Sequence, residues 1–111
     1  MTNKIVVLVT VGNAREARKI AQGVIESRLA ACVNITPAVR SLYRWKGKIV
    51  DDRELLLIIK TTRGHFGDLK EFVLSNHSYS TPEVIALPVI DGSLDYLQWI
   101  EKSVGRTGNR E

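Results

Sequence analysis

The sequence predicts a single α+β domain in which two helices cover one face of an antiparallel sheet and a third helix follows the last strand. Two observations predict it. The hydrophobic periodicity gives the order strand, helix, long hairpin, helix, strand, which is a split βαβ arrangement. The apolar pattern then continues to residue 104, so we expect one domain over residues 1–104 and a disordered tail over residues 105–111.

The composition is that of an ordinary globular protein. Of the 111 residues, 44% are hydrophobic and 25% are charged, which argues against disorder. The longest apolar runs, IVVLV and LLLII, are far shorter than the roughly 20 residues of a transmembrane helix. The net charge of +4 is spread among acidic residues, so we expect no nucleic-acid and no membrane partner. A single cysteine and the lack of a secretory cleavage site predict a cytoplasmic protein.

The first strand and helix have the clearest signals. Residues 4–11 are aliphatic and β-branched, and they end at Gly12, which predicts a buried strand followed by a turn. Asn13 is suited to cap the next helix, and Glu16 to complete a capping box. The helix places one apolar stripe against the core, formed by Ala17, Ile20, Ala21, Val24 and Ile25.

A long hairpin follows, with its turn at Lys46-Gly47-Lys48. Residues 30–36 alternate as a strand, and Pro37 interrupts the ladder because proline cannot donate a hydrogen bond. At about 3.3 Å per residue, each arm approaches about 45 Å, whereas a typical strand spans about 20 Å. We therefore expect the hairpin to overhang its own domain.

The second half of the chain supplies the remaining elements. A second helix is expected from Thr62 or Arg63 to near Asn76. Residues 83–90 predict a strand at an edge of the sheet, because a proline stands near its end. A third helix follows, and Gly105 ends it.

The strands are apolar on both faces, which predicts an oligomer. Val7 and Val9 point to one face of the first strand, whereas Val6 and Leu8 point to the other. Such strands are typical of a sheet covered on both sides. A split βαβ domain places its helices on one side only, so we expect other copies of the chain to cover the second face.

Four segments of the sequence are distinctive: ESRLAACVNI, RSLYRWKGKI, LLLIIKTT and TPEVIALPVIDGSLDYLQWI. In order and spacing they resemble the CutA family over residues 4–104. The resemblance implies a ferredoxin-like sandwich with a long hairpin and an extra C-terminal helix, assembled as a homotrimer similar in plan to the PII signalling proteins. It also implies a role in tolerance of divalent cations, with copper or another divalent cation bound, no tightly required cofactor and no catalysis.

The resemblance further implies candidate metal ligands. Cys32 matches the cysteine of the family's AACxNI segment, and His77 and Glu83 match its HPYxxPE loop, from which Ser78 and Ser80 depart. Copper favours thiolate and imidazole ligands. The residues alone form no metal motif, because no C-x-x-C or H-x-x-x-H spacing occurs. A buried thiol acting as a small hydrophobic side chain, and a histidine capping a helix end, are the alternatives.

Aromatic residues near the hairpin tip predict a contact surface. Tyr43 and Trp45 share one face of the hairpin and are expected either to pack on a neighbouring subunit or to stack on a ligand. The residues that we expect in a cleft between subunits are Tyr43, Trp45, Lys60, Tyr79 and Trp99.

Two acidic residues share a face of the hairpin's second arm. Asp52 and Glu54 offer the oxygen ligands that a hard cation prefers. Opposite charges across a hairpin are ordinary stabilisers, so we expect these carboxylates to pair with Arg40 or Arg44 instead.

Other classes of function fit the sequence less well. An RNA-binding module of this topology needs aromatic residues on its central strands, and residues 4–11 and 54–61 contain none. An enzyme needs a base paired with a nucleophile or a glycine-rich phosphate loop, and neither pattern occurs. A PII-like trimer that senses a small molecule, or acts as an interaction scaffold, is the alternative.

Overall fold

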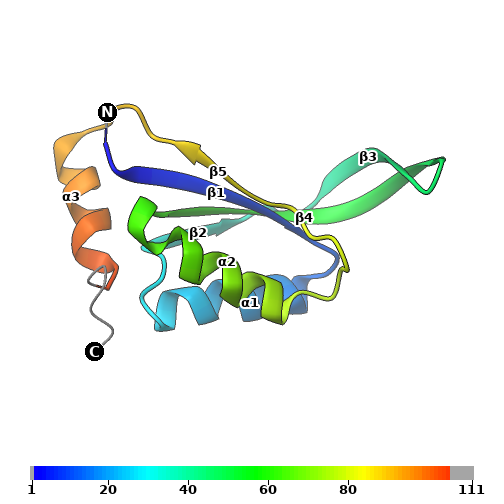
Figure 1. Cartoon of the computed structure of the whole chain (residues 1–111), viewed down its shortest axis with the longest axis horizontal. Helices are drawn as coiled ribbons and strands as arrows, with labels where there is room; N and C mark the ends of the chain where they lie inside the picture. Colours follow the sequence, from blue (N-terminus) through cyan, green and yellow to red (C-terminus); the bar gives the residue numbers. More distant parts are fainter. Residues whose placement is uncertain (1, 106–111) are drawn as a thin grey trace.

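The computed structural model describes residues 2–105, which form one α+β domain with an antiparallel sheet (Figure 1). The strands are β1 (Lys4–Val11), β2 (Cys32–Ile35), β3 (Val39–Trp45), β4 (Lys48–Thr62) and β5 (Val84–Pro88). The helices are α1 (Ala14–Glu26), α2 (Phe66–Asn76) and α3 (Leu94–Ser103), with a short 3-10 turn, η1 (Arg63–His65), before α2. Residues 106–111, which carry most of the predicted tail, lie outside the described residues.

The sheet has the strand order β2-β4-β1-β5, and each of these pairs is antiparallel. β1 lies in the middle, paired with β4 from Lys4↔Thr62 to Val11↔Leu55. β5 forms one edge, as the proline near its end predicted. The expected first arm of the hairpin is two strands, because the chain leaves the ladder after Ile35 and rejoins β4 at Val39.

The outer hairpin of β3 and β4 projects beyond the rest of the domain, as expected (Figure 1). Trp45 pairs with Lys48, which leaves a two-residue turn. The turn residues Lys46 and Gly47 have φ angles of 52° and 78°, in the left-handed region that such tight hairpin turns require. The projection helps make the molecule 43 Å long but only 23 Å thick.

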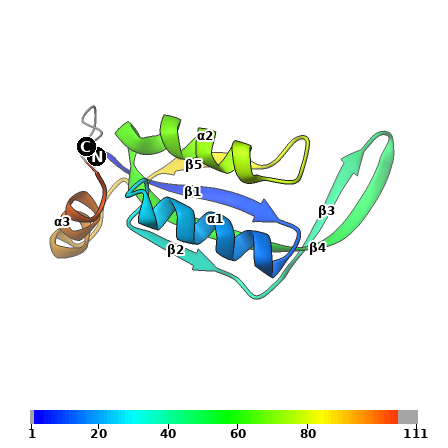
Figure 2. The same ribbon diagram turned by 90° about the horizontal axis from the view of Figure 1, so that it is seen from below.

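One face of the sheet is closed by α1 and α2, which lie side by side across it (Figure 2). On that face Val7, Val9, Leu57 and Ile59 are all 0% exposed. The two helices approach closely at Gly23, where an added Cβ would lie 2.2 Å from Cζ of Phe72. We call this the closed face.

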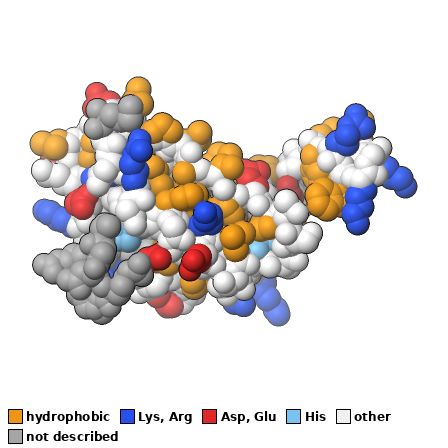
Figure 3. Space-filling view, viewed as in Figure 1, with side chains coloured by type: hydrophobic (Ala, Val, Ile, Leu, Met, Phe, Trp, Pro, Cys, Tyr) orange, Lys and Arg blue, Asp and Glu red, His pale blue; other side chains and the backbone are white. Residues whose placement is uncertain are grey.

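The opposite face, which we call the open face, carries apolar side chains without a full cover. Val6 and Ile58 are only half-buried, and Ile85 and Leu87 on the edge strand are 50% and 48% exposed. In Figure 3 apolar side chains gather across the middle of the molecule and on the hairpin, with basic side chains at the hairpin's outer end. The prediction of strands that are apolar on both faces is therefore confirmed.

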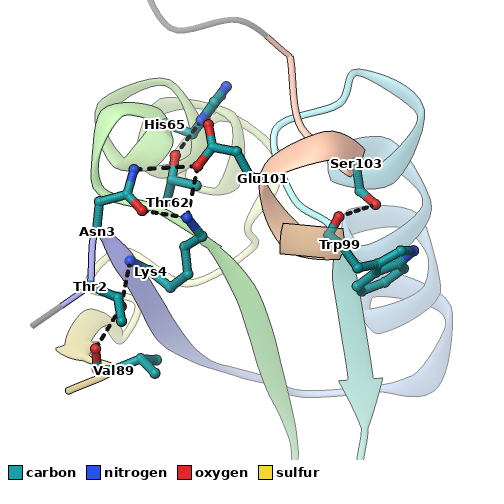
Figure 4. A network of polar contacts seen from close by, with 9 residues as sticks. All are labelled: Thr2, Asn3, Lys4, Thr62, His65, Val89, Trp99, Glu101 and Ser103. Atoms are coloured by element: carbon teal, nitrogen blue, oxygen red, sulfur yellow. Dashed lines mark hydrogen bonds and ion pairs between the residues drawn. The ribbon is translucent and has the colours of Figure 1, made fainter. Parts of the chain in front are cut away.

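α3 lies at the end of the molecule away from the hairpin and is fixed there by polar contacts (Figure 4). Nζ of Lys4 lies 2.7 Å from Oε1 of Glu101 and also donates to Asn3. After the helix, the Gly105 amide donates to the carbonyl of Arg28 at 2.9 Å. Among the described residues, no helix has the length and apolar character needed to cross a membrane.

Candidate functional site

A groove of about 690 Å³ lies where the projecting hairpin meets the body of the domain. The strand register explains its lining. Thr10 pairs with Leu56, so its side chain falls on the same face as Glu54 and Asp52 further along β4. Ser41 pairs with Asp52 across the hairpin, which puts Tyr43 on that face as well. The groove is lined by Thr10, Arg40, Ser41, Leu42, Tyr43, Trp45, Asp52, Glu54, Tyr79, Ser80, Thr81 and Glu83.

Two tyrosines hold two of the carboxylates in the groove. The Tyr43 hydroxyl donates to Oδ2 of Asp52 at 2.5 Å, and the Tyr79 hydroxyl donates to Oε2 of Glu54 at 2.9 Å. Glu54 is only 5% exposed. Both phenolic protons therefore point at carboxylate oxygens, and Glu54 is held inside the domain by a hydrogen bond from the loop after α2.

The expected pairing of Asp52 or Glu54 with an arginine is wrong. Arg40 instead forms a bidentate contact with Asp51, with Nη2 to Oδ2 at 2.9 Å. The register opposes Arg40 to Arg53, which puts Arg40 and Asp51 on the hairpin face turned away from Asp52 and Glu54. The one cation in the groove wall is thus engaged by a carboxylate that does not line the groove.

The ionisable groups of the groove influence one another. The hydrogen bond to Asp52 raises the pKa of Tyr43 to about 12. Burial, followed by the hydrogen bond to Glu54, raises the pKa of Tyr79 further. Burial raises the pKa of Glu83 as well, and the negative charge of Glu54 adds to that rise. Three groups with shifted pKa values in one concave surface are typical of a binding site.

His77 does not line the groove, but it contacts the backbone of two residues that do, Thr10 and Tyr79. Its side chain is fully buried, and Nε2 lies 2.7 Å from the Thr10 carbonyl, to which it donates. Nδ1 accepts the Tyr79 amide at 3.1 Å and lies 3.2 Å from a carboxylate oxygen of Glu16. The Asn13 side chain caps α1 as predicted, but Glu16 does not complete a capping box. It contacts this loop instead, so α1 helps to position Tyr79.

Cys32, Lys60 and Trp99 lie at the other end of the open face, away from the groove. Cys32 pairs with Lys60 between β2 and β4, and Nζ of Lys60 donates to Oδ1 of Asn34. Burial, and then the neighbouring Cys32, raises the pKa of Tyr96 on α3. The Tyr96 and Trp99 rings stack with centroids 5.5 Å apart. The thiol of Cys32 is free and partly exposed.

The residues singled out in the sequence therefore fall into two groups on one face. The groove brings together Tyr43, Trp45, Tyr79 and Glu83, whereas Cys32 lies at the α3 end. Within residues 2–105, no three side chains among His, Cys, Asp and Glu are close enough to share a metal ion. The groove residues not foreseen as site residues are Thr10, Ser41, Thr81 and the wall residues Arg40 and Leu42. Strand alternation across a two-residue turn was the signal that would have found Ser41.

Comparisons with known proteins agree on one family. Residues 5–103 match the family model for the CutA1 divalent ion tolerance protein. The chain is 50% identical to the "Divalent-cation tolerance protein CutA" of Thermus thermophilus over 100 residues, which are 90% of this chain and 97% of that protein. It is also 50% identical to "Protein CutA, chloroplastic" of Arabidopsis thaliana over 99 residues, 89% of this chain but only 54% of that longer protein.

A solved structure extends the agreement to three dimensions. The "Divalent cation tolerance protein (Cut A1)" from Thermus thermophilus matches with a TM-score of 0.90 and 49% identity, over 92% of this chain and 99% of that one. The fold, the sequence relatives and the family model thus point the same way. The chain belongs to the CutA1 divalent ion tolerance protein family.

Proposed function

We propose that this chain is a non-enzymatic, cytoplasmic homotrimer that binds copper or another divalent cation and so contributes to divalent-cation tolerance. Membership of the CutA1 family and the similarity to the divalent-cation tolerance protein of Thermus thermophilus support the role. The proposal includes the ferredoxin-like sandwich and the PII-like trimer that the sequence resemblance implies. In this proposal the protein needs no tightly bound cofactor.

The open face is the main observation that supports a trimer. Its apolar side chains include Ile85 and Leu87, both about half exposed, beside the half-buried Val6 and Ile58. Contiguous apolar surface of this kind is typical of an interface. The two edges of the sheet, β2 and β5, are different surfaces, so a head-to-tail contact between them is heterologous. Three copies related by a rotation of 120° about one axis would close such contacts into a ring.

The same arrangement supports a metal site that is completed between subunits. Cys32 lies on the β2 edge, whereas Glu83 lies just before β5 at the opposite edge. In the proposed head-to-tail ring, the β2 edge of one copy faces the β5 edge of the next, and the proposal assigns the thiol of one copy and the carboxylate of its neighbour to one shared site. Copper favours the thiolate. His77 would have to exchange its contact with Thr10 or Glu16 to join them.

Native mass spectrometry of metal-stripped protein titrated with copper and zinc tests this function. We expect a trimer that retains copper, with Cys32→Ser and Glu83→Gln each reducing the bound copper. Glu71→Gln on the exposed side of α2 is the matched control and should bind copper as the parent does. If the protein is a monomer at micromolar concentration, the proposed trimer is wrong. If Cys32→Ser binds as much copper as the parent, the thiol is not a copper ligand.

The second candidate is a PII-like trimer that senses a small molecule, and the groove favours it. Its volume of about 690 Å³ is in the range of small-molecule sites, which run from about 300 to 1,000 Å³. Thermal unfolding separates the two candidates. Copper should leave the melting temperature of a small-molecule sensor unchanged, whereas its ligand should raise it.

A further inference from the structure

His65 is a buried ionisable residue that takes no part in the candidate sites. It ends the 3-10 turn η1, and only 6% of its surface is exposed. Its Nδ1 lies 2.6 Å from the hydroxyl oxygen of Thr62. Among residues 2–105, its Nε2 is the single buried side-chain nitrogen or oxygen without a hydrogen-bond partner. Nearly all buried polar groups in proteins are paired, so this unpaired nitrogen needs an explanation.

The cost of the unpaired nitrogen depends on the charge of the ring. A neutral ring can donate from Nδ1 to the Thr62 hydroxyl and leave only a lone pair at Nε2. A protonated ring carries N–H groups at both nitrogens, so it buries a positive charge whose second donor has no acceptor. Burying a charged donor without a partner costs more than burying a neutral group. Histidine is the side chain that ordinarily changes charge between about pH 5 and pH 8.

The ring of His65 lies beside the contacts that attach α3 to the domain. Figure 4 shows the carboxylate of Glu101 between the ring of His65 and the ammonium group of Lys4. The hydrogen bond from Lys4 lowers the pKa of Glu101, and the nearby His65 adds to that lowering. On another side, Nε2 faces the backbone just after α3, since a Cβ added at Gly105 would lie 4.0 Å from it.

The surroundings of His65 are mostly basic. The charged residues around it are Lys4 from β1, Arg28 from the loop after α1, Glu101 and Lys102 from α3, and Arg63 and Asp68 from η1 and α2. Glu101 is the carboxylate that interacts with His65, and its Oε1 already accepts from Lys4 at 2.7 Å. A protonated His65 can pair its Nε2 only if Glu101 or the backbone at Gly105 moves, and both belong to the attachment of α3.

We propose that His65 is a pH-sensitive switch for the C-terminal helix: the neutral ring lets α3 dock, and protonation of the ring loosens it. Docking is therefore complete above the pH range in which histidine titrates and is weakened as the pH falls through that range. The switch goes beyond the proposed function, because Cys32, His77 and Glu83 take no part in it. It sets the state of the end of the molecule that carries Trp99.

Hydrogen–deuterium exchange of the metal-stripped full chain between pH 5 and pH 8 tests the switch, with rates corrected for the intrinsic pH dependence of amide exchange. We expect the amides of α3 to exchange about fivefold faster or more at the acid end, since an unpaired buried donor costs about 1 kcal/mol or more. The amides of α1 are the internal control and should show no such change. His65→Gln cannot become charged, so α3 should lose its pH response in this variant.

A measurement on the parent protein keeps the test valid if His65→Gln folds poorly. NMR of the histidine rings should show the Hε1 signal of His65 titrating over the same pH interval in which the exchange of α3 accelerates. Exchange of α3 that stays constant over the interval overturns the proposal. So does a response of α3 that follows the titration of His77, the chain's other histidine, or that persists in His65→Gln. Equal acceleration in α1 and α3 also overturns it, because the whole domain then opens in acid.

Discussion

The two faces of the sheet use the same strands in different ways. On the closed face, Val7 and Val9 of β1 and Leu57 and Ile59 of β4 pack under α1 and α2 and are fully buried. On the open face, even-numbered residues of the same strands run from Lys60 near α3, through apolar side chains, to Glu54 and Asp52 in the groove. One face thus stabilises the domain, and the other carries every candidate site residue except His77. Because successive residues of a strand point to opposite faces, the residues that stabilise the core and the candidate site residues alternate along the same strands.

The largest expected effect compares two neighbours on β4 that point to opposite faces. Ile59→Ala removes a side chain that is 0% exposed and should lower the free energy of unfolding by about 2–5 kcal/mol, as for other large-to-small core changes. Ile58→Ala, on the open face, should cost less and should instead shift the protein to smaller species in dilute solution. Urea unfolding and sedimentation velocity measure the two effects. Equal unfolding costs with unchanged sedimentation would mean that the chain itself covers both faces.

The next effect tests how tightly the closed face is packed. Gly23→Ala should destabilise the protein by about 1–3 kcal/mol, because the new methyl group meets the Phe72 ring and overpacks the contact between α1 and α2. Helix propensity alone predicts the opposite result, an increase in stability of about 1 kcal/mol, because alanine favours the helix more than glycine does. Lys19→Ala, on the exposed side of α1, is the control. Thermal unfolding decides the sign, and the double variant Gly23→Ala/Phe72→Leu should recover part of the loss.

Much of this arrangement was predictable because it depends on local pattern. The aliphatic run of residues 4–11 became β1, Asn13 caps α1, and the proline near the end of β5 marked an edge strand. Apolar residues on both faces of β1 predicted a second face that needs a cover. These features need only alternation, helical periodicity and the chemistry of proline and asparagine.

The groove was less predictable because it depends on register and on contacts between distant segments. Arg40 joined Asp51 rather than Asp52, a difference decided by the pairing across a two-residue turn. Glu16 was expected to cap its own helix, yet its carboxylate accepts the amide of Ser78, which lies 62 positions later in the chain. Hydrophobic periodicity does not predict a contact between residues so far apart in sequence, so the role of Glu16 in positioning the Tyr79 loop could be seen only in the structure.

A smaller effect is expected at the α3 end of the molecule. Hydrogen bonding from Lys4 lowers the pKa of Glu101, so this pair stabilises the fold above the usual carboxyl range and the stabilisation is lost as pH falls through the lowered pKa. Glu101→Gln should therefore cost up to about 1 kcal/mol at neutral pH, since water screens a half-exposed carboxylate, and nothing in acid. Thermal unfolding at pH 7 and pH 3 measures the difference. A cost that persists at pH 3 would indicate lost packing instead of lost charge.

The smallest effect has the opposite sign and lies in the groove. The pKa of Glu83 is raised, so its ionisation opposes folding, and stability falls as pH rises from the ordinary carboxyl range through the raised value. Glu83→Gln should therefore be more stable than the parent at neutral pH, by less than about 1 kcal/mol because Glu83 is exposed to water, and equal to it in acid. Glu71→Gln should show no such pH dependence. A variant less stable than the parent at neutral pH without any ligand would mean that the groove already holds its positive partner.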